Sequence, residues 1–408
     1  MTKLIPISKA LSIVGRETRA LAAEEIKLAM AVGRVLAEEV LADSDMPPFD
    51  RSQMDGYAVK AKDTANAPVE LKIVGESAAG RGWHDELKKG EAVRIMTGAR
   101  VPKGADSVQK IELTNESGDM LTVNEPTGKG RYIVRKGAEM RKGSRLFRPG
   151  EWIDEKMIAS LAAFGYATLR VAVQPTVSIL ATGSEIVAVD KLPAVDQIRN
   201  SNSVMLKAMC EKAGSRPKVL PGVGDNLSRL VASISGACRP KSAIRSPRSE
   251  ILILTGGVSV GKYDLTKAAL RELGAEIFFE RVRLKPGKPT VFGRLNETLV
   301  FGLPGNPVSA AVTFYLFVRT AILRMQGAGE DGLREGHAVL GSNAKAARER
   351  DTYLPATLST DKTGRLVATP LRWLGSSDFV GFAKANALVF VPRGASITKG
   401  EVARILFI

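Results

Sequence analysis

Hydrophobic residues in the middle of the chain fall in short runs that stop at glycine or proline. Four such runs occupy residues 177–180, 251–254, 281–284 and 298–301. Apolar runs of this length, bounded by turn residues, are typical of buried strands in a parallel sheet. Helical patterns follow or separate them over 202–213, 226–235, 265–273 and 308–325. This alternation predicts an α/β domain with a parallel sheet and helices on both faces.

The two ends of the chain have other patterns. Apolar residues between 7 and 42 recur at a roughly helical spacing, and Gly33 interrupts them, which predicts two helices. Another helix is expected over 153–164, ended by Gly165. Strand-like runs punctuated by glycine and proline predict an all-β module between them and a small C-terminal barrel or sandwich. These runs are 69–74, 92–96, 106–112 and 120–123, then 352–358, 366–369, 387–391 and 402–407.

The composition limits the chemistry. The formal net charge of +16 fits a solvated basic surface or an anionic substrate. Aromatic residues make up only 5%, and none interleaves with a basic run, so no nucleic-acid partner is expected. Two cysteines, Cys210 and Cys238, form no CxxC pair, and His84 and His337 are the only histidines. A thiolate or histidine metal site is therefore not expected, which leaves carboxylates, lysines, hydroxyls and backbone amides.

The sequence also bears on location. The N-terminus has no sustained apolar core, so no signal peptide is expected. The longest apolar stretch, 310–323, is broken by Arg319 and falls short of the ~20 residues that cross a bilayer. We therefore expect a cytoplasmic protein without a membrane partner.

Loops that follow the apolar runs are the candidate site, because the carboxyl ends of parallel strands share one edge of the sheet. Gly256 and Gly257 follow one strand, and 302–307 follows another and leads into a helix. Such loops hold phosphates with backbone N–H groups, although tight strand–helix turns look the same. In a third loop Lys285 and Lys288 flank Pro-Gly, so two ammonium groups could hold one anion, or the loop could be ordinary surface.

Carboxylates stand beside these loops. Glu185, Asp225 and Asp264 each follow a predicted strand end, where they could hold Mg²⁺ or position water. Helix capping is the structural alternative for Asp225 and Asp264. Asp55 lies in the β module, where a plain Asp-Gly turn is the alternative. Neither GxxxxGK[ST] nor a GxGxxG after a strand is present, so a P-loop or dinucleotide fold is not expected.

Several longer motifs together resemble one family, the molybdopterin molybdenumtransferases, which include bacterial MoeA and the E domain of gephyrin. The motifs are PPFDRSQMDGYAV at 47–59, RIMTGARVPKGAD at 94–106, ATGSEI at 181–186, NSNSVML at 200–206, LTGGVSVGKYD at 254–264, LKPGKPTVFG at 284–293 and FGLPGNPVSA at 301–310. The resemblance implies a multidomain fold of α/β plus β. It implies a helical/strand linker domain at 1–45 with 146–174, an inserted β-rich domain at 46–145, a pterin-binding α/β domain at 175–328 and a C-terminal β-barrel at 329–408.

The resemblance also implies a reaction, in which adenylylated molybdopterin and molybdate give the molybdenum cofactor and AMP with Mg²⁺. It implies a homodimer with composite sites. Catalytic roles fall on Asp55, Thr97, Asp225 and Asp264, and Mg²⁺ binding falls on Glu185 and Asp264. Molybdate is assigned to Lys285, Lys288, Arg350 and Ser376. The pterin substrate is assigned to Gly256, Gly257, Ser259, Pro304, Gly305, Asn306 and Pro307.

Three alternatives stay open. Molybdopterin adenylyltransferases share the α/β domain, but they lack the N-terminal β domain and the C-terminal barrel that this chain has. A non-catalytic pterin-binding scaffold is the second alternative. Tungstate, a tetrahedral dianion of nearly the same size, is an alternative to molybdate.

Overall fold

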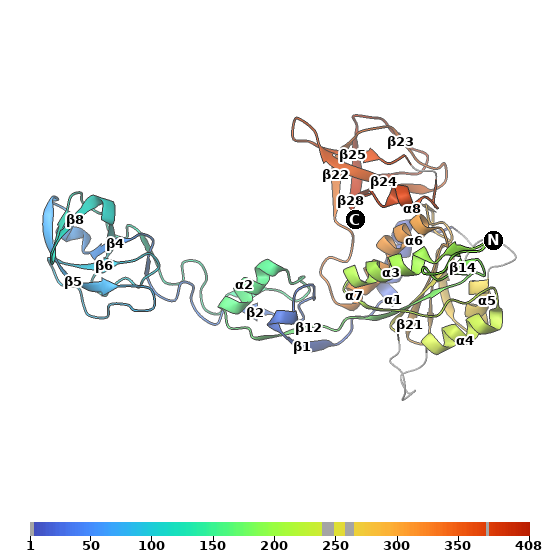
Figure 1. The fold of residues 1–408 in the computed structure, drawn as a ribbon, viewed down its shortest axis with the longest axis horizontal. Coiled ribbons are helices and arrows are strands. Elements are labelled where there is room, and N and C mark those ends of the chain that lie inside the picture. The colour runs from blue at the N-terminus through green and yellow to red at the C-terminus, as the bar shows by residue number, and fades with distance from the viewer. Residues whose placement is uncertain (1–3, 239–248, 258–264, 373–374) are drawn as a thin grey trace. The chain divides into compact units, whose positions relative to one another are not determined.

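The computed structural model describes residues 4–238, 249–257, 265–372 and 375–408. Two residues of the predicted site, Ser259 and Asp264, lie outside these ranges. The chain forms two compact units (Figure 1). The larger unit comprises residues 1–37, 149–155 and 168–408, and the smaller unit comprises 38–148 and 156–167.

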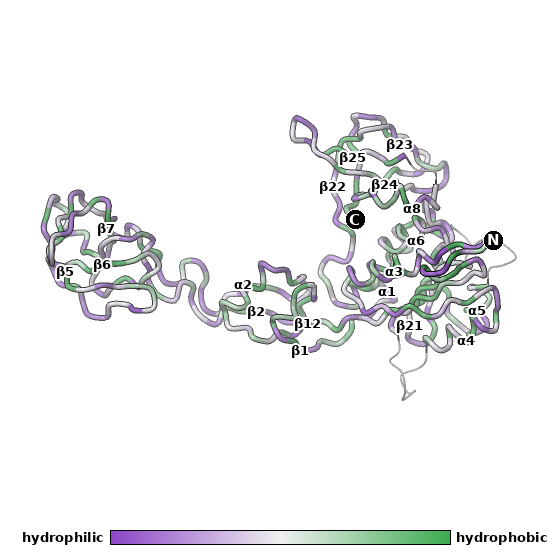
Figure 2. The backbone as a smooth tube through the Cα atoms, in the orientation of Figure 1, coloured by the Kyte–Doolittle hydropathy of each residue, from purple (hydrophilic) through white to green (hydrophobic). Residues whose placement is uncertain are grey.

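The larger unit contains a six-stranded sheet in the order β16-β13-β17-β21-β20-β18. Its parallel strands are β16 (Arg216–Val219), β13 (Thr176–Ala181), β17 (Ile251–Thr255) and β21 (Thr298–Leu303). Strand β20 (Val291–Leu295) runs antiparallel to β21. The edge strand β18 (Glu276–Phe279) pairs antiparallel with β20, so it runs in the same direction as the parallel strands. Every residue of β17 and β21 is buried, and hydrophobic residues mark this region in Figure 2. The parallel core of the α/β prediction is thus confirmed.

Helices cover both faces of this sheet, as predicted. On one face, α1 (Ile7–Glu17), α3 (Ser201–Lys212) and the helix Pro307–Met325 share one hydrophobic core. On the other face, α4 (Leu227–Ala237) and α5 (Leu265–Glu272) form a second core. Cys210, on α3, is fully buried in the first core.

Helix Pro307–Met325 is long and apolar enough to cross a membrane, yet 83% of its most apolar window is buried inside the molecule. It consists of α6 (Pro307–Thr313), a π-helical turn (Phe314–Val318) and α7 (Arg319–Met325). Its residues pack against the sheet, so it is a core helix of this unit.

The C-terminal part of the larger unit is a closed barrel. Its strands pair around a ring in the order β24-β25-β22-β28-β26, and β26 returns to β24. Their bounds are β24 (Asp351–Thr360), β25 (Leu366–Pro370), β22 (Glu335–Leu340), β28 (Val402–Phe407) and β26 (Ala387–Val391). The predicted barrel is therefore confirmed.

The strand predicted over 281–284 is wrong as a member of the parallel sheet. Only Leu284 and Lys285 form a strand, β19, and it pairs with β24 of the barrel sheet. The hydrophobic run is real, because Val282 and Leu284 are fully buried. Burial alone does not say which sheet a run joins, so the pattern indicated a strand and not its partner.

The two helices predicted between residues 7 and 42 are also partly wrong. Helix α1 ends at Glu17, because Thr18 has an extended backbone. Beyond it, β1 (Ala23–Lys27) pairs with β12 (Thr168–Ala172), and β2 (Val40–Leu41) pairs with β11 (Arg145–Phe147). Partners far along the chain supply the backbone hydrogen bonds here, and tertiary pairing overrides a local helical pattern.

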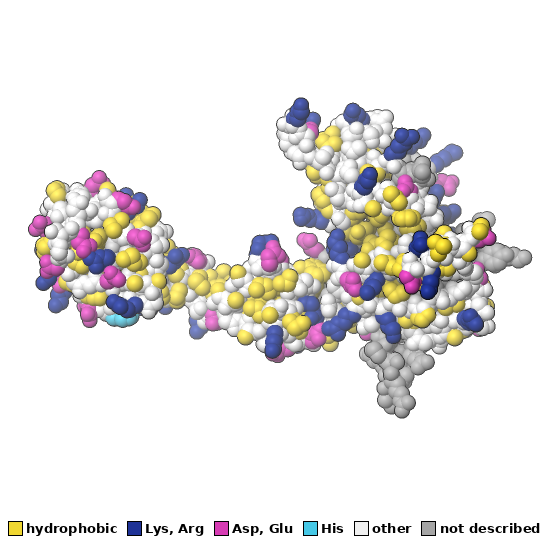
Figure 3. Space-filling model, in the orientation of Figure 1, with side chains coloured by type: hydrophobic (Ala, Val, Ile, Leu, Met, Phe, Trp, Pro, Cys, Tyr) yellow, Lys and Arg dark blue, Asp and Glu magenta, His cyan; other side chains and the backbone are white. Residues whose placement is uncertain are grey.

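The smaller unit contains the predicted all-β module. Its sheet has the order β7-β4-β6-β5-β9-β8. The strands are β4 (Gly56–Val59), β5 (Val69–Ser77), β6 (Glu91–Ile95), β7 (Ser107–Lys110), β8 (Thr114–Ser117) and β9 (Met120–Val123). Helix α2 (Glu155–Ala163) matches the predicted helix, and Gly165 with φ of +80° follows it. Figure 3 shows Lys and Arg side chains scattered over both units on the face drawn, with no single basic stripe.

Candidate active site

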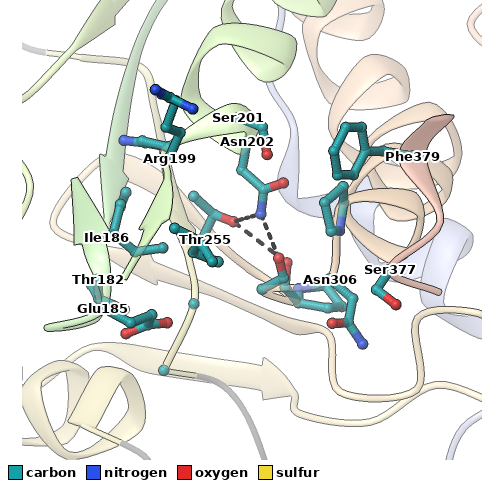
Figure 4. Close-up of a pocket in the computed structure, with 18 of the residues that line it drawn as sticks. Thr182, Glu185, Ile186, Arg199, Ser201, Asn202, Thr255, Asn306, Ser377 and Phe379 are labelled. Carbon is teal, nitrogen blue, oxygen red and sulfur yellow. Dashed lines mark hydrogen bonds between the residues drawn. The ribbon is translucent and has the colours of Figure 1, made fainter. Parts of the chain in front are cut away.

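A cavity of about 910 Å³ lies at the carboxyl ends of β13, β17 and β21. These three strands are neighbours in the sheet, so the loops that follow them meet at one edge. The cavity brings together seven residues that the sequence assigned to the site: Glu185, Gly256, Gly257, Pro304, Gly305, Asn306 and Pro307. Pro289, at the end of the lysine loop, also lines it. Figure 4 shows the side chains around this cavity.

The Gly256-Gly257 turn lies against the loop that follows β13. Both glycines have positive φ, +93° and +61°. A Cβ on Gly256 would lie 2.3 Å from the carbonyl oxygen of Thr182, and one on Gly257 would lie 2.9 Å from the Thr182 hydroxyl. Only glycine therefore allows both this backbone conformation and this approach. The turn follows a strand whose five residues are all buried, so it is held in place.

Asn202, in the first turn of α3, joins the loops on the cavity wall. Its side-chain nitrogen donates to the hydroxyl oxygen of Thr255 at 2.9 Å and to the carbonyl oxygen of Gly305 at 2.7 Å. Thr255 in turn donates to the carbonyl oxygen of Pro304 at 3.4 Å. Figure 4 draws these bonds as dashed lines. The ends of β17 and β21 are thereby fixed to one helix.

The helix that carries Asn202 begins at a capping residue. Asn200 stands in the NSNSVML stretch and is the N-cap of α3, where its side-chain oxygen accepts from the amide of Ser203 at 3.0 Å. An aspartate would offer the same acceptor in this position.

The rim of the cavity is apolar. Strands β14 (Ile186–Val187) and β15 (Ile198–Arg199) pair beside it. Val189 is 53% exposed and Ile198 is 58% exposed, and both line the opening. Phe379, at the start of α8 (Phe379–Phe382), is 51% exposed and lines the same cavity. Exposed apolar side chains around a polar floor suit a flat, partly apolar ligand.

Two of the predicted carboxylates, Glu185 and Asp225, lie on adjoining loops, and Asp225 is not among the residues that line the cavity. Glu185 is exposed and lines the cavity. Asp225 pairs with the neighbouring Ser184, whose hydroxyl accepts from the Asp225 amide at 2.9 Å. Capping of α4 by Asp225, the structural alternative, is wrong, because Asn226 is the cap and accepts from the amide of Arg229. Among the residues described, no three histidine, cysteine or carboxylate side chains lie together as a metal site.

The predicted molybdate residues come from two parts of the larger unit. Strand β19 pairs with β24 so that Lys285 lies opposite Thr352, two residues beyond Arg350. Ser376 accepts a 2.8 Å hydrogen bond from the side chain of Asn306, and its carbonyl oxygen accepts from the amide of Val308. The barrel and the segment before α8 therefore supply residues beside the α/β loops.

Asp55 and Thr97 belong to the smaller unit, where pairing of β4 with β6 brings them together. One carboxylate oxygen of Asp55 accepts from the Thr97 amide at 2.6 Å and from its hydroxyl at 2.9 Å. These bonds, the amide bond first, lower the pKa of the Asp55 carboxyl. Asp55 is thus more than a turn residue, since its side chain is an exposed, oriented carboxylate.

Comparison with known proteins shows to which family a chain with this arrangement belongs. Three family profiles match the chain: the MoeA N-terminal region (domain I and II) at 5–165, a probable molybdopterin binding domain at 178–324, and the MoeA C-terminal region (domain IV) at 337–408. A molybdopterin molybdenumtransferase of Bacillus subtilis is 35% identical over 413 residues, which cover 99% of this chain and 94% of that protein. The chain belongs to the MoeA family.

Other MoeA relatives agree. A molybdopterin molybdenumtransferase of Staphylococcus aureus (strain COL) is 33% identical over 395 residues, which cover 96% of this chain and 92% of that one. The crystal structure of the molybdopterin biosynthesis MoeA protein from Pyrococcus horikoshii OT3 matches with a TM-score of 0.84, at 29% identity and 100% coverage of both chains. The predicted family and fold class are thus confirmed.

Among the residues of this MoeA cavity that sequence reasoning missed are Thr182, Asn202 and Phe379. Asn202 stood inside a quoted motif without a role. Its place in the first helical turn after β15 was a usable signal, because helix N-termini in α/β folds point at the ligand edge. Phe379 follows the last strands of α/β pattern by many residues, and no local pattern connects it to the cavity.

Proposed function

We propose that this chain is a molybdopterin molybdenumtransferase, which takes adenylylated molybdopterin and molybdate and releases the molybdenum cofactor and AMP. The observation that supports this most directly is the cavity at the ends of β13, β17 and β21. It combines a glycine turn, a helix start at Pro307 and an apolar rim beside a lysine loop. A pterin with a phosphoric anhydride needs both an apolar platform and oxyanion contacts.

Three cations of the larger unit suit molybdate. Lys285 is exposed, and Lys288 and Arg350 are partly exposed. Lysine ammonium groups held by a proline-containing loop, together with a guanidinium, compensate the charge of a dianion. The Ser376 hydroxyl adds a neutral hydrogen-bonding group, and it is already oriented by Asn306. We assign the molybdate to these four side chains.

Glu185 and Asp225 are the candidates for Mg²⁺ within the described residues. Mg²⁺ prefers carboxylate oxygens and commonly keeps several waters, so two carboxylates on adjoining loops fit its chemistry. When bound, Mg²⁺ would offset negative charge on the phosphoric anhydride. Asp264 belongs to this proposal by its place in the family motif.

We further propose a homodimer with composite sites, in which Asp55 and Thr97 of one copy serve the cavity of the other. Mixing two inactive variants tests it. Neither D55N nor K288A should release AMP alone, whereas their mixture should regain about a quarter of wild-type activity, because mixed dimers keep one intact site. No recovery after verified subunit exchange would reject composite sites.

The main test follows AMP. The protein is incubated with adenylylated molybdopterin and Mg²⁺, with and without molybdate, and AMP release is measured together with activation of an apo-molybdoenzyme. Molybdate-dependent release is expected. Binding without release would favour the scaffold alternative, and formation of adenylylated pterin from ATP would favour an adenylyltransferase. Replacing molybdate by tungstate in the same assay compares the two oxyanions.

A further inference from the structure

Two buried polar atoms on the cavity wall lack a hydrogen-bond partner within the part of the chain described. They are the side-chain oxygen Oδ1 of Asn202 and the hydroxyl Oγ1 of Thr182. Asn202 is 9% exposed and Thr182 is 6% exposed, and both line the cavity. An unsatisfied buried polar atom costs about 1–3 kcal/mol, and the large majority of such atoms are paired. Two such atoms in residues that line one cavity indicate that a ligand supplies the missing partners.

The orientation of the Asn202 amide is fixed by its surroundings. The carbonyl oxygen of Gly305 can only accept, so the amide nitrogen must face it, and its second proton goes to Thr255. Both N–H bonds of the side chain are therefore used inside the protein. In Figure 4 the remaining oxygen points away from these bonds, to the side where Phe379 lies. This oxygen can only accept, so the ligand must offer a donor there.

This requirement separates the anionic groups of the proposed substrate from its heterocyclic parts. Phosphate and molybdate oxygens are acceptors and cannot satisfy the Asn202 oxygen. The 2-amino-4-oxo edge of a pterin carries an N3–H and an amino group side by side, both of them donors. The half-exposed ring of Phe379 offers a surface on which a flat heterocycle can stack. The anionic end would then extend to the loop of Lys285 and Lys288.

We propose that Asn202 Oδ1 recognises the N–H edge of the pterin ring, which makes Asn202 a specificity-determining residue of this cavity, and that Thr182 Oγ1 forms a separate hydrogen bond to the same ligand. The inference rests on the proposed function, because it takes the pterin as the ligand. It adds the residues that read the ring and the direction in which the ring enters. Asn202 has a second, structural role, because its nitrogen holds Thr255 and Gly305.

The first experiment compares two threonine-to-valine substitutions in order to separate ligand recognition from a structural role. Thr182→Val removes a hydroxyl without a partner, so the melting temperature should not fall, while binding of 6-hydroxymethylpterin phosphate should weaken about three- to tenfold. Thr255→Val is the matched control, because its hydroxyl is bonded inside the protein, so its melting temperature should fall. Wild-type pterin affinity in Thr182→Val would overturn the role of that hydroxyl.

The second experiment changes the ligand as well as the protein. The wild type should bind 6-hydroxymethylpterin phosphate at least about tenfold more tightly than its 3-methyl derivative, which lacks the N3–H. Asn202→Ala should bring this ratio to about threefold or less. Any loss of stability affects both ligands alike and cancels in the ratio. An unchanged ratio in Asn202→Ala would overturn the inference and leave the AMP-release result standing, whereas a wild type that binds neither pterin would overturn the inference and contradict the proposed function.

Discussion

Thr97 donates two hydrogen bonds to a single carboxylate oxygen of Asp55, one from its amide at 2.6 Å and one from its hydroxyl at 2.9 Å. Both residues are exposed, so a substrate can reach them from the solvent. The two bonds favour the charged carboxylate and leave its other oxygen without a bond to Thr97. Asp55 is thus a carboxylate held in one orientation and kept ionised.

The hydroxyl bond can be removed while the amide bond stays. In Thr97→Val the pKa of Asp55 should rise but remain below its ordinary value, because the amide bond is the larger cause. Thr97→Ser keeps the hydroxyl and should leave the pKa unchanged. The folded pKa lies below the unfolded one, so the stabilisation is present above an unfolded pKa of about 3.9 and is lost as the pH falls through the folded value. Carbon-13 NMR titration of the carboxyl measures the shift, and an unmoved pKa in Thr97→Val would contradict this account.

Replacing glycine by alanine should change the free energy of unfolding differently in the glycine turn and in helix α4. Gly256→Ala should destabilise the protein by about 1–3 kcal/mol or more, because φ is positive and the new Cβ meets the Thr182 carbonyl. Gly236 lies inside α4 with open space around its Cα, so Gly236→Ala should be neutral or stabilise by up to about 1 kcal/mol. Urea unfolding measures both changes. Equal effects of the two substitutions would show that the turn is not strained.

The thiol of Cys210 should be unreactive in the folded protein. Burial in the core beside α3 raises its pKa to about 12, so almost no thiolate is present at neutral pH. In Cys238→Ser, which leaves Cys210 as the only thiol, a disulfide reagent at pH 8 should react only after denaturant is added. Rapid reaction of the folded variant would mean that the core around α3 opens readily.

The contact between Asn306 and Ser376 should matter for molybdate more than for folding. Ser376→Ala removes the acceptor of a partly exposed 2.8 Å bond, worth about 0.5–1.5 kcal/mol. We expect the KM for molybdate to rise about two- to tenfold, with little change in melting temperature. Ser359→Ala, an exposed position in β24 away from this loop, is the control. A lower melting temperature with an unchanged KM would give Ser376 a structural role instead.

The sequence predicted those parts of the fold in which local pattern and final structure agree. The buried runs at 177–180 and 251–254 became β13 and β17, because an apolar run between turn residues has few other places in an α/β domain. The same rule placed 281–284 in the wrong sheet, since the partner of β19 is more than sixty residues away and leaves no mark on the run itself.

Some residues of the candidate site could likewise be predicted from the sequence, and others could not. Glycine and proline mark loops in a sequence, so Gly256, Gly257 and residues 304–307 of the cavity wall could be named in advance. Asn202 could not be given a role, because its importance lies in one oxygen left over after two donated bonds. This unpaired oxygen exists only once the three loops have come together in the fold, and no residue spacing along the chain predicts it.

The pairing of β19 with β24 has a consequence for how this protein can be altered. The lysine loop is hydrogen-bonded at its first residue to β24 of the barrel, so under the proposed function the barrel helps to position a molybdate-binding residue. Cutting the chain after Met325 would remove Arg350 and Ser376 and also release Lys285 from its ladder. Exchanging barrels between relatives should therefore alter oxyanion preference.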